Sequence, residues 1–494
     1  MKTEPPAAHR PVVAILGGGV SGAATAFHLA RALPAGEARI VVVEPRATLG
    51  KGLAYATEEP SHRINVPATK MSLIGDDIGH FADWLRTERI EMSPGTLTLR
   101  GDYFPERRIF GQYVSAQLAP LVASGAVRHL RAAAVSVTRA GEGYRVELND
   151  GSALDADLVV LAMTHPAPAV PWALRGLSGS RRLIADPYDN ARIGAIGLGE
   201  RVLIVGTGLT SADVMASLHR RGFRGRATAL SRHGLRSRGH GVVTRGTTAD
   251  FAKAPERTAV AVLRRVRAAV AADAARGQDW HAALDKVREQ GDAIWAALEP
   301  RERRRLVRHL RRFWDVHRFR IAPQVEAVVE AAIAAGRLEV LAARLVDASE
   351  DAEGITVRYR PRGEAGIRSE RFDTVVVTTG PDHSEILRSN PAFRALAEEG
   401  LLREDPLGLG LMVTGGCRTV ARDGTASETL FVAGPLARGD VGELMGVPEV
   451  VRHAERLAAL IAGRLTARMT PPAEAVSEVA KPRRGGAWLG PRTR

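Results

Sequence analysis

The sequence is 494 residues long, which is enough for about three domains of ordinary size. Hydrophobic residues make up 45% of it and charged residues 25%, as is typical of a water-soluble globular protein. No apolar run approaches the ~20 residues of a membrane span. The first strand is reached by Val12 without a secretory signal pattern before it, so we expect a cytoplasmic protein with no membrane partner.

The net charge of +14 does not by itself indicate a nucleic-acid-binding protein. Only six of the 69 basic residues are lysine, and they are spread widely without an RNA-binding aromatic motif. We therefore expect no nucleic-acid partner, while an arginine-lined site for a small anion stays open. The single cysteine, Cys417, excludes disulfide exchange, which needs a pair. The fourteen histidines show no ligand spacing, so we predict no metal site.

The stretch that ends at Glu44 has the order of elements found in a dinucleotide-binding unit. Apolar residues from Val12 predict a buried strand, and Gly17, Gly19 and Gly22 follow at GxGxxG spacing before a helical pattern. The first glycine permits a tight turn, the second lets the backbone approach a pyrophosphate, and the third lets the helix pack closely. Glu44 ends the next strand, where it is placed to accept hydrogen bonds from ribose hydroxyls. We expect this unit to bind FAD.

The segment "VLIVGTGLTSADVM" repeats this plan with informative changes. Gly206 and Gly208 keep the first two glycine positions, and Ser211, a small residue, replaces the third. The next strand ends in Ser231 and Arg232, where the first unit has its glutamate. A carboxylate there would repel the 2′-phosphate of NADP, whereas serine and arginine can bind it. We expect NADPH in this unit, with NADH left open; a solvated surface arginine is the alternative interpretation of Arg232.

An internal repeat supports the division into two nucleotide-binding units. Each unit carries a strand meander and a closing apolar strand, which begins after Asp157 in the first unit and after Asp373 in the second. A late apolar strand, "TLFVAGP", is followed by a helical pattern. The simplest arrangement is an α/β protein with two Rossmann-like dinucleotide-binding domains, the second inserted in the first, and a helical insert.

The expected boundaries are 1–170 and 381–465 for the FAD-binding domain, 171–240 and 336–380 for the NAD(P)-binding domain, 241–335 for the helical insert and 466–494 for a flexible tail. Within the insert, Leu306, Leu310 and Phe313 recur at helical spacing. Pro323 is expected to end one helix, and Gly336 to cap the next.

With these residues in place, the chain resembles the FAD/NAD(P)-binding flavoproteins that include the HpyO-type urate hydroxylases and the CreE-type aspartate N-monooxygenases. The resemblance covers roughly residues 12–460. Its matching segments are "GGGVSG", "GKGLAYATEEPSHRINVPATKMS", "GTGLTSADV", "SRHGLRSRGH", "FWDVHRFRIAP" and "LFVAGPLARGDVGELMGVPEV". The resemblance implies that Gly52, Tyr55 and Gly434 contact the cofactor.

Two positions depart from the pattern of these flavoproteins. Thr164, in "AMTH", stands where relatives tend to have a glycine, which affects the backbone between the domains. Gly442 and Glu443 stand where relatives often have a tryptophan–glutamate pair, so the shape of the pocket there is expected to differ.

The resemblance implies an FAD-dependent monooxygenase that consumes NAD(P)H and molecular oxygen. Oxygen adds to the reduced flavin, and the resulting flavin hydroperoxide attacks a small, anionic, nitrogen-containing substrate. Two alternatives stay open: an NAD(P)H:acceptor flavin dehydrogenase without oxygen insertion, and a flavin-binding regulatory protein with little turnover. The sequence leaves the substrate's identity and the oligomeric state undetermined.

Two segments supply the candidate catalytic residues. His62, Arg63 and Asn65 fall in the segment that lies near the flavin in these flavoproteins; a packed histidine is the alternative for His62. His317 and Arg318 are expected to reach the cleft and bind an anionic group, aided by His240, because arginine donates to carboxylates in a planar fork. A solvated basic helix face is the alternative. The helix that begins near Val447 is expected to point its N-terminus at the flavin ring.

Overall fold

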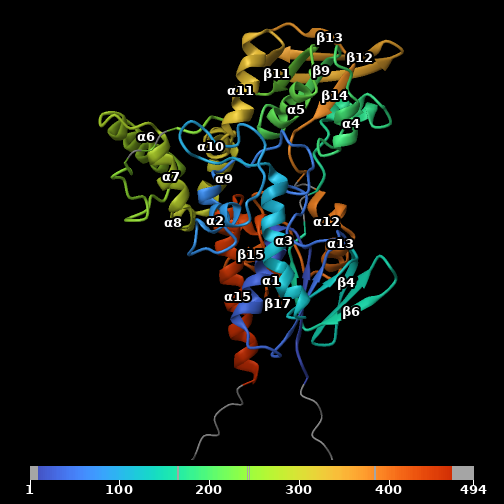
Figure 1. Cartoon of the computed structure of the whole chain (residues 1–494), viewed down its shortest axis with the longest axis vertical. Coiled ribbons are helices and arrows are strands. Elements are labelled where there is room, and N and C mark those ends of the chain that lie inside the picture. The colour runs from blue at the N-terminus through green and yellow to red at the C-terminus, as the bar shows by residue number, and fades with distance from the viewer. Residues whose placement is uncertain (1–8, 164–165, 242, 244, 383–384, 470–494) are drawn as a thin grey trace, which may run out of the picture.

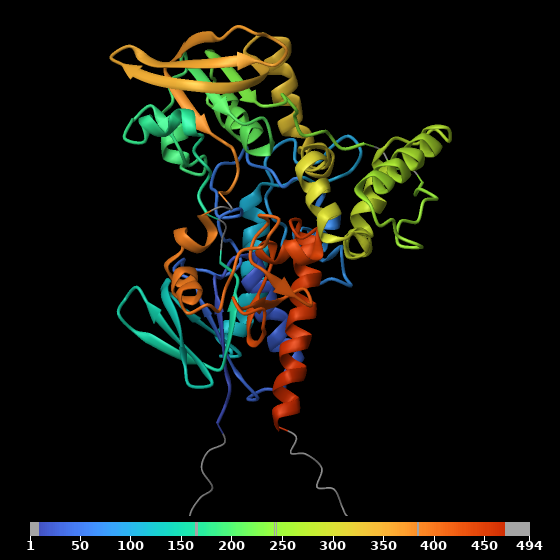
Figure 2. The same cartoon turned by 180° about the vertical axis from the view of Figure 1, so that it is seen from behind.

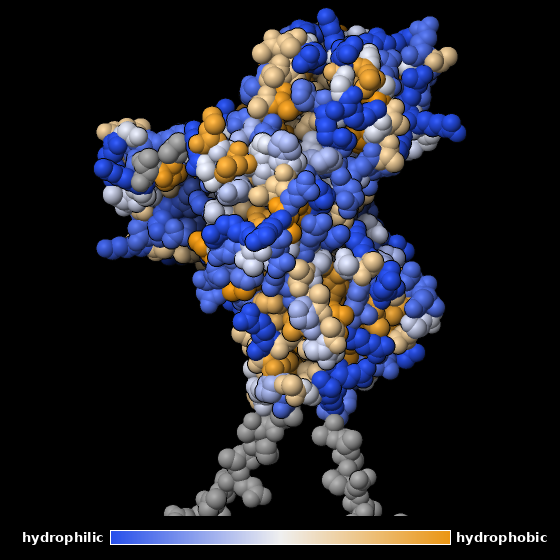
Figure 3. Space-filling view, in the orientation of Figure 1, coloured by the Kyte–Doolittle hydropathy of each residue, from blue (hydrophilic) through white to orange (hydrophobic). Residues whose placement is uncertain are grey.

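The computed structural model describes residues 9–163, 166–241, 243, 245–382 and 385–469. Thr164 and the tail from Thr470, both singled out in the sequence, lie outside the described residues. Two seven-stranded sheets, one three-stranded sheet and their helices make up the described chain (Figure 1). Within it, no helix combines the length and apolar character needed to cross a bilayer. Figure 3 shows hydrophilic side chains over most of one face, with hydrophobic ones in small groups.

The first sheet is built from both ends of the chain. Its seven strands have the order β15-β16-β17-β7-β1-β2-β3. The strands are β1 (Val12–Leu16), β2 (Arg39–Val43), β3 (Val127–Leu130), β7 (Leu158–Leu161), β15 (Val413–Thr414), β16 (Arg418–Val420) and β17 (Ala426–Val432). From β17 to β3 all neighbours run parallel, whereas β15 and β16 add an antiparallel edge.

Alternate residues of β1 face two different layers, as the period of a strand requires. Val13 and Ile15 pack into the core formed with α1 (Val20–Ala32), α3 (Arg107–Ala123) and α15 (Val447–Met469). Ala14 and Leu16 pack toward the other face. That face is covered by β4 (Ala134–Ala140), β5 (Gly143–Leu148), β6 (Ala153–Ala156), α12 (Ile386–Ser389) and α13 (Pro391–Glu398). Figures 1 and 2 both show α15 running beside α1 along this first unit.

In the sequence, all strands of the second sheet lie between the two segments that form the first sheet. Its order is β13-β12-β11-β10-β9-β14-β8, and it is parallel from β11 to β8. The strands are β8 (Leu183–Ile184), β9 (Arg201–Val205), β10 (Arg226–Ser231), β11 (Leu338–Asp351), β12 (Gly354–Pro361), β13 (Arg368–Phe372) and β14 (Thr374–Val377). The order confirms the predicted insertion of one nucleotide-binding fold in the other.

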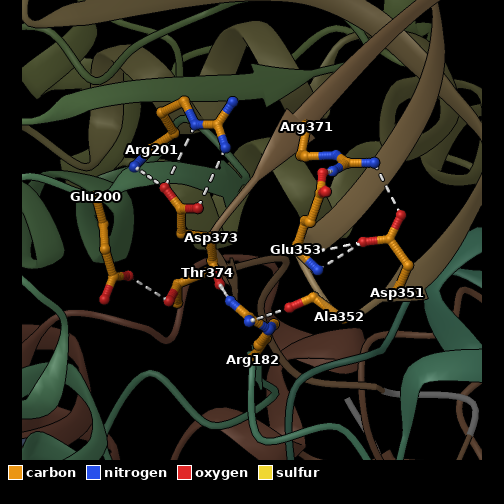
Figure 4. Close-up of polar contacts among 10 residues, drawn as sticks. Arg182, Glu200, Arg201, Asp351, Ala352, Glu353, Arg371, Asp373 and Thr374 are labelled. Atoms are coloured by element: carbon orange, nitrogen blue, oxygen red, sulfur yellow. Dashed lines mark hydrogen bonds and ion pairs between the residues drawn. The ribbon is translucent and has the colours of Figure 1, made fainter.

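The two units close in the same way, at the aspartates that the internal repeat aligned. Asp157 accepts a hydrogen bond from the Val12 N–H at 2.7 Å, and its own N–H donates to the Val12 carbonyl at 2.9 Å. Asp373 makes the same two contacts with Arg201, at 2.7 and 2.8 Å, as Figure 4 shows for the side chain. Each aspartate thus fixes the register of the closing strand beside the first strand of its unit.

Six further helices separate β10 from β11. They are α6 (Ala259–Ala274), α7 (His281–Glu289), α8 (Gly291–Ala297), α9 (Pro300–His309), α10 (Arg311–Arg318) and α11 (Pro323–Ala334). Of the first five, α6, α7 and α8 project to one side of the molecule, and α9 and α10 lie between them and its body (Figure 1); we call these five the insert helices. The sixth, α11, packs on α5 (Leu209–Arg220) and β11 of the second unit.

The predicted helix boundaries in this region are partly wrong. Pro323 begins α11, and the preceding helix has already ended at Arg318. The residue before the proline, Ala322, is extended as expected. Gly336 follows the end of α11 with φ of +65°, the left-handed conformation that favours glycine.

The carboxyl edges of the two sheets face the same junction. The chain leaves β7 and β14 through two linkers that pair with each other at Pro168 and Pro381. The Ala169 N–H donates to the Gly380 carbonyl at 3.1 Å, and the Thr379 hydroxyl donates to the Ala169 carbonyl at 2.6 Å. Ligands of open parallel sheets bind outside the carboxyl ends of the strands, so this junction is where a site is expected.

Candidate functional site

The first glycine turn needs glycine for geometric reasons. Gly17 has φ of +101°, and a Cβ there would lie 2.6 Å from the Ala162 carbonyl oxygen. A Cβ on Gly22 would lie 1.9 Å from the Gly17 carbonyl oxygen. The absence of a side chain at both positions lets the start of α1 pack directly against the turn after β1.

The start of α1 is open to an anion. The helix begins after Gly19, with no capping side-chain hydrogen bond and no acidic residue in its first turn. Gly52, with φ of +53°, packs its backbone against Gly19, where a Cβ would meet the Gly19 Cα at 2.9 Å. On the other side, Gly434, with φ of +82°, approaches Ser21 so closely that a Cβ would lie 2.1 Å from its hydroxyl. The free N–H groups fit a pyrophosphate.

Glu44 lies at the end of β2, as expected, with its side chain turned into the protein. One oxygen accepts from the Gly18 N–H at 2.9 Å, and the other accepts from the Arg46 backbone at 3.1 Å and its guanidinium at 3.0 Å. A carboxylate offers about four acceptor positions, so one is left for a ribose hydroxyl. Ribose binding by Glu44 stays a prediction.

The second glycine turn fits a dinucleotide in a different way. Gly206 has φ of +128° and lies against Thr378, where a Cβ would come within 2.4 Å of the hydroxyl. Gly208 has φ of −89°, and nothing lies within 4 Å of the place a Cβ would take. Neither backbone strain nor packing requires glycine there, whereas a phosphate at the uncapped start of α5 needs that space. Ser211 is buried in the position of the third glycine.

The turn after β10 presents a hydroxyl and a guanidinium. The Ser231 hydroxyl accepts from Thr207 at 2.9 Å and from the Gly234 N–H at 3.0 Å, which ties it to the glycine turn. Arg232 is exposed and makes no hydrogen bond or ion pair with another described residue. Burial and the nearby Arg312, Arg362 and Arg232 lower the pKa of His233, so the field here is positive. This field suits the 2′-phosphate predicted for the site.

A cavity of about 1030 Å³ lies where the three parts of the chain meet. Its lining includes Asn65 and Lys70 of the first unit, His240 after β10, Arg318 and Arg320 at the end of the insert helices, and Glu449 at the start of α15. We call it the junction cavity. The first turn of α15 borders the cavity, and the orientation of its N-terminus toward the flavin ring stays a prediction.

Asn65 and His240 join two units at the cavity wall. His240 Nε2 donates to the Asn65 carbonyl at 3.0 Å, and the ring packs edge-on against Phe104. Burial, with Arg320 nearby, lowers the pKa of His240 to about 4, so its imidazole is neutral at pH 7. The Asn65 side-chain amide makes no hydrogen bond with another described residue, which leaves it available to a ligand.

Arg318 borders the junction cavity with its guanidinium already engaged by two carboxylates. It lies 2.9 Å from Glu443 and 3.1 Å from Glu449 and is 8% exposed. Glu449 also receives two hydrogen bonds from Arg288, at 2.8 and 3.0 Å. Burial raises the pKa of Glu449, but the bonds from Arg288 and the charge of Arg318 outweigh it and hold the pKa below its usual range. We call these four residues the junction ion pairs.

The other three candidate catalytic residues lie away from this cavity. His62 is 6% exposed and bonds Thr57 and Ser217, each at 3.0 Å. Arg63 is buried and donates to the Thr96 hydroxyl at 2.8 Å. His317, the residue before Arg318 on α10, faces a different direction; it bonds the Phe313 carbonyl and borders a second, apolar cavity. Of the five candidates, the structure therefore brings Asn65 and Arg318 to one cavity, and catalysis by any of them stays a prediction.

Tyr55 is half-buried against the core of the first unit. Its ring lies 4.8 Å from that of Phe110, and burial raises the pKa of its hydroxyl to about 12. Cofactor contact by Tyr55 stays a prediction. Burial likewise raises the pKa of the Cys417 thiol to about 11, so it is an unreactive thiol at pH 7. Among the described residues, no group of three or more histidine, cysteine or acidic side chains is arranged to hold a metal ion.

Sequence reasoning missed several residues of the cavity, including Lys70, Arg100, Arg288 and Arg320. Lys70 and Arg320 lie within two of the segments that carry the resemblance, but nothing in those segments distinguishes them, and no motif contains Arg100 or Arg288. Only the folded chain brings the four together. At Gly442 the fold also explains the missing tryptophan. A Cβ there would lie 2.7 Å from the Trp295 ring, so a tryptophan from the insert helices fills the space.

Comparisons with known proteins agree with this architecture. Residues 14–166 match the NAD_binding_9 family, described as FAD-NAD(P)-binding, so the chain contains an FAD/NAD(P)-binding domain. No curated protein matches the sequence.

Several solved structures share the fold over almost the whole chain. L-lysine 6-monooxygenase from Pseudomonas syringae is 18% identical with a TM-score of 0.63, over 94% of this chain and 100% of that one. The ornithine N-hydroxylase KtzI from Kutzneria sp. 744, solved with reduced FAD, NADP⁺ and L-ornithine, is 16% identical with a TM-score of 0.61. The ornithine hydroxylase PvdA from Pseudomonas aeruginosa, in its reduced form, is 15% identical with a TM-score of 0.61. Each of the last two covers 93% of this chain and 100% of its own.

Proposed function

We propose that the protein is an FAD-dependent, NADPH-consuming monooxygenase that hydroxylates the nitrogen of a small amine carrying an anionic group. The observation that carries this proposal is the junction cavity of about 1030 Å³ at the meeting of the two carboxyl sheet edges. A dinucleotide held at each glycine turn would extend toward this cavity. The names of the structural neighbours, which include lysine and ornithine hydroxylases, support an amine as the substrate.

The reaction balances with four reactants. An amine, O₂, NADPH and a proton give an N-hydroxylamine, water and NADP⁺. FAD, when bound, supplies the chemistry of accepting a hydride from NADPH and activating oxygen for transfer. The chain supplies binding, orientation and the exclusion of water.

The residues of the chain divide this work by position. The uncapped starts of α1 and α5 would hold the two pyrophosphates, and Ser231 with Arg232 would hold the 2′-phosphate. At the cavity, the Asn65 amide is free to orient a ligand. Lys70 and Arg100 border the cavity without an ion pair to a described carboxylate, so they are the cations that favour an anionic substrate.

The test is a two-step reaction on the FAD-loaded protein. Under anaerobic conditions NADPH is expected to bleach the flavin absorbance. Air is then admitted with a panel of amines that carry a carboxylate, including amino acids. We expect oxygen uptake that depends on one amine and a product heavier by one oxygen atom.

Each other result has a definite meaning. Bleaching without amine-dependent oxygenation across the panel, but with electron transfer to a quinone, would replace the proposal by an NAD(P)H:acceptor dehydrogenase. Bound FAD that neither NADPH nor NADH reduces, with or without amines, would replace it by a flavin-binding regulatory protein.

A further inference from the structure

A second cavity, of about 310 Å³, lies between the insert helices and the C-terminal part of the first unit. Most of the side chains that border it are apolar, including Val262, Val266, Trp295, Leu306, Trp314 and Leu409. We call it the insert cavity. Phe313 also borders it and is 45% exposed, so part of the cavity wall lies at the molecular surface. None of the glycine turns and none of the candidate cofactor-binding residues borders it.

The volume of the insert cavity limits the size of the molecule that it can hold. An apolar cavity of about 150 Å³ stays dry and accepts a single benzene ring. The insert cavity has about twice that volume, which suits a two-ring aromatic or a branched aliphatic molecule. Ligand pockets in proteins are typically lined by hydrophobic and aromatic side chains in this way.

The two tryptophans of the wall present carbon surface rather than hydrogen-bonding groups. The Trp295 Nε1–H donates to the Gly439 carbonyl at 3.0 Å, and the Trp314 Nε1–H donates to the Glu443 carboxylate at 3.2 Å. An indole has no other donor and no acceptor. Both tryptophans therefore offer a ligand only their rings.

The charged side chains that border the insert cavity are two cations and two carboxylates. They are Arg311, Arg438, Asp315 and Glu443. Asp315 lies 3.4 Å from Arg311, and Glu443 lies 2.9 Å from Arg318, which borders the junction cavity. Each carboxylate of the wall thus already has a guanidinium beside it.

The charge of Arg438 is compensated as well. This residue is 6% exposed and donates to the Leu409 carbonyl at 3.0 Å. Three carboxylates act on its charge: Asp315, Glu443 and Asp405. Burial, the largest influence on its pKa, lowers the pKa to about 10, so the guanidinium is charged at pH 7. Among the described residues of the wall, every charge is therefore opposed by another.

Compensated charges in an apolar wall select against ions. An ionised ligand would lose its hydration on entry, and no uncompensated charge of the described wall would replace that hydration. A carboxylate would also face Asp315 and Glu443, and an ammonium would face Arg311 and Arg438. A neutral apolar molecule gains free energy from burying its surface and has no such cost.

From the volume, the apolar lining and the compensated charges, we propose that the insert cavity is a binding site for a neutral two-ring aromatic or branched aliphatic molecule. The ligand packs between α6, α8 and α9 on one side and Leu409, Gly442 and Met445 on the other. It therefore bridges the insert helices and the first unit. The site is distinct from the positions predicted for FAD and NADPH, and its ligand is not the charged amine of the proposed reaction.

The test measures the binding of naphthalene to the full-length, FAD-loaded protein by equilibrium dialysis at pH 7.5. We expect one molecule to bind per chain. The analogues 2-naphthoate and 2-naphthylmethylamine have the same rings and carry one negative or one positive charge. Each is expected to bind at least about tenfold more weakly, because its charge loses hydration without gaining a partner. No NADPH is added, so the result does not depend on the proposed monooxygenase activity.

Two cavity-filling variants and one matched control locate the binding site. Val266→Trp fills the cavity and is expected to abolish binding. Val260→Trp makes the same change on the same helix at a position that is 46% exposed and outside the cavity, and this variant is expected to bind normally. Leu306→Phe fills less of the space and serves if Val266→Trp does not fold, as judged by FAD content.

Three results would overturn the proposal. The first is the absence of saturable naphthalene binding to the unmodified protein. The second is binding by the filling variants that equals binding by Val260→Trp, because the probe would then occupy another site. The third is a charged analogue that binds as tightly as naphthalene, because the wall would then hold an opposite charge for it.

Discussion

Arg232 and Arg226 are exposed arginines at opposite ends of β10. Arg232 stands just after the carboxyl end of the strand, beside Ser231 and the start of α5. Arg226 stands at the other end of the same strand, away from the glycine turn. Both side chains are exposed, and neither is ion-paired to a described residue. Removing each arginine in turn therefore distinguishes a loss of positive charge at the glycine turn from a loss of positive charge elsewhere on the same strand.

Arg232→Ala is expected to weaken the use of NADPH and to spare the use of NADH. Loss of charge-assisted hydrogen bonds to the 2′-phosphate costs roughly 1.5–3 kcal/mol, which corresponds to about 10–100-fold in affinity. The measurement is the dependence of the anaerobic flavin reduction rate on the concentration of each nicotinamide. Arg226→Ala should leave both dependences unchanged. An equal effect of Arg232→Ala on NADH and NADPH would remove Arg232 from the 2′-phosphate site.

At the scale of elements, the first turn of α15 is held by the junction ion pairs. Glu449 lies in this turn, where a carboxylate also interacts favourably with the helix dipole. Arg288 of α7 and Arg318 of α10 reach it from the insert helices. The insert is thereby fastened to the first unit at the border of the junction cavity.

Arg318→Ala is expected to destabilise the protein as well as any substrate complex. The change leaves Glu443 and Glu449 buried with fewer partners, and breaking a buried ion pair costs about 3–5 kcal/mol. Urea unfolding measures the loss, and exposed Arg312→Ala on the same helix should change stability by less than about 0.5 kcal/mol. A raised substrate KM with unchanged stability would instead show that Arg318 is free to bind the substrate directly.

The contrast between α1 and α10 shows how far the sequence predicts this molecule. The strand, glycines, helix and acidic residue of each unit are local patterns, so both nucleotide-binding folds and the insertion of the second in the first were predicted. The partners of Arg318 are not local: Glu443 and Glu449 are more than 120 residues away. Helical spacing predicts the helix α10 but not which of its side chains face which cavity. We expected His317 and Arg318 at one cleft, whereas they border different cavities.

On the scale of the whole molecule, the two units are joined by a network around His62. Arg107 of α3 pairs with Asp213 of α5 at 2.8 Å, and Arg220 pairs with Glu59 across the same boundary. These neighbouring charges largely offset one another around His62. Burial is therefore the dominant influence on its pKa and lowers it.

The hydrogen bonds of His62 require a neutral ring. The Ser217 hydroxyl donates to the Asp213 carbonyl at 3.0 Å, so it accepts from His62 Nε2. The Thr57 hydroxyl already accepts from the Glu59 N–H and the Asn190 amide, so it donates to His62 Nδ1. If Nδ1 were protonated, its N–H and the Thr57 hydroxyl would both be donors, and this buried contact would have no acceptor.

Acid is therefore expected to weaken the contact between the units. The pKa of His62 in the folded protein lies below the unfolded value of about 6.5. As the pH falls below 6.5, the unfolded chain therefore binds a proton at His62 more readily than the folded chain does. The stabilisation is complete above pH 6.5 and is lost progressively as the pH falls below it. His240, which bonds Asn65 across the same junction with a pKa of about 4, acts in the same direction.

Thermal unfolding at stepwise pH values between 7.5 and 5 measures how steeply stability falls with pH. His62→Gln, which keeps a donor and an acceptor but does not titrate, should flatten that slope, whereas His309→Gln at an exposed position should not. If all three proteins lose stability with the same slope, protonation of His62 does not control the joining of the two nucleotide-binding units.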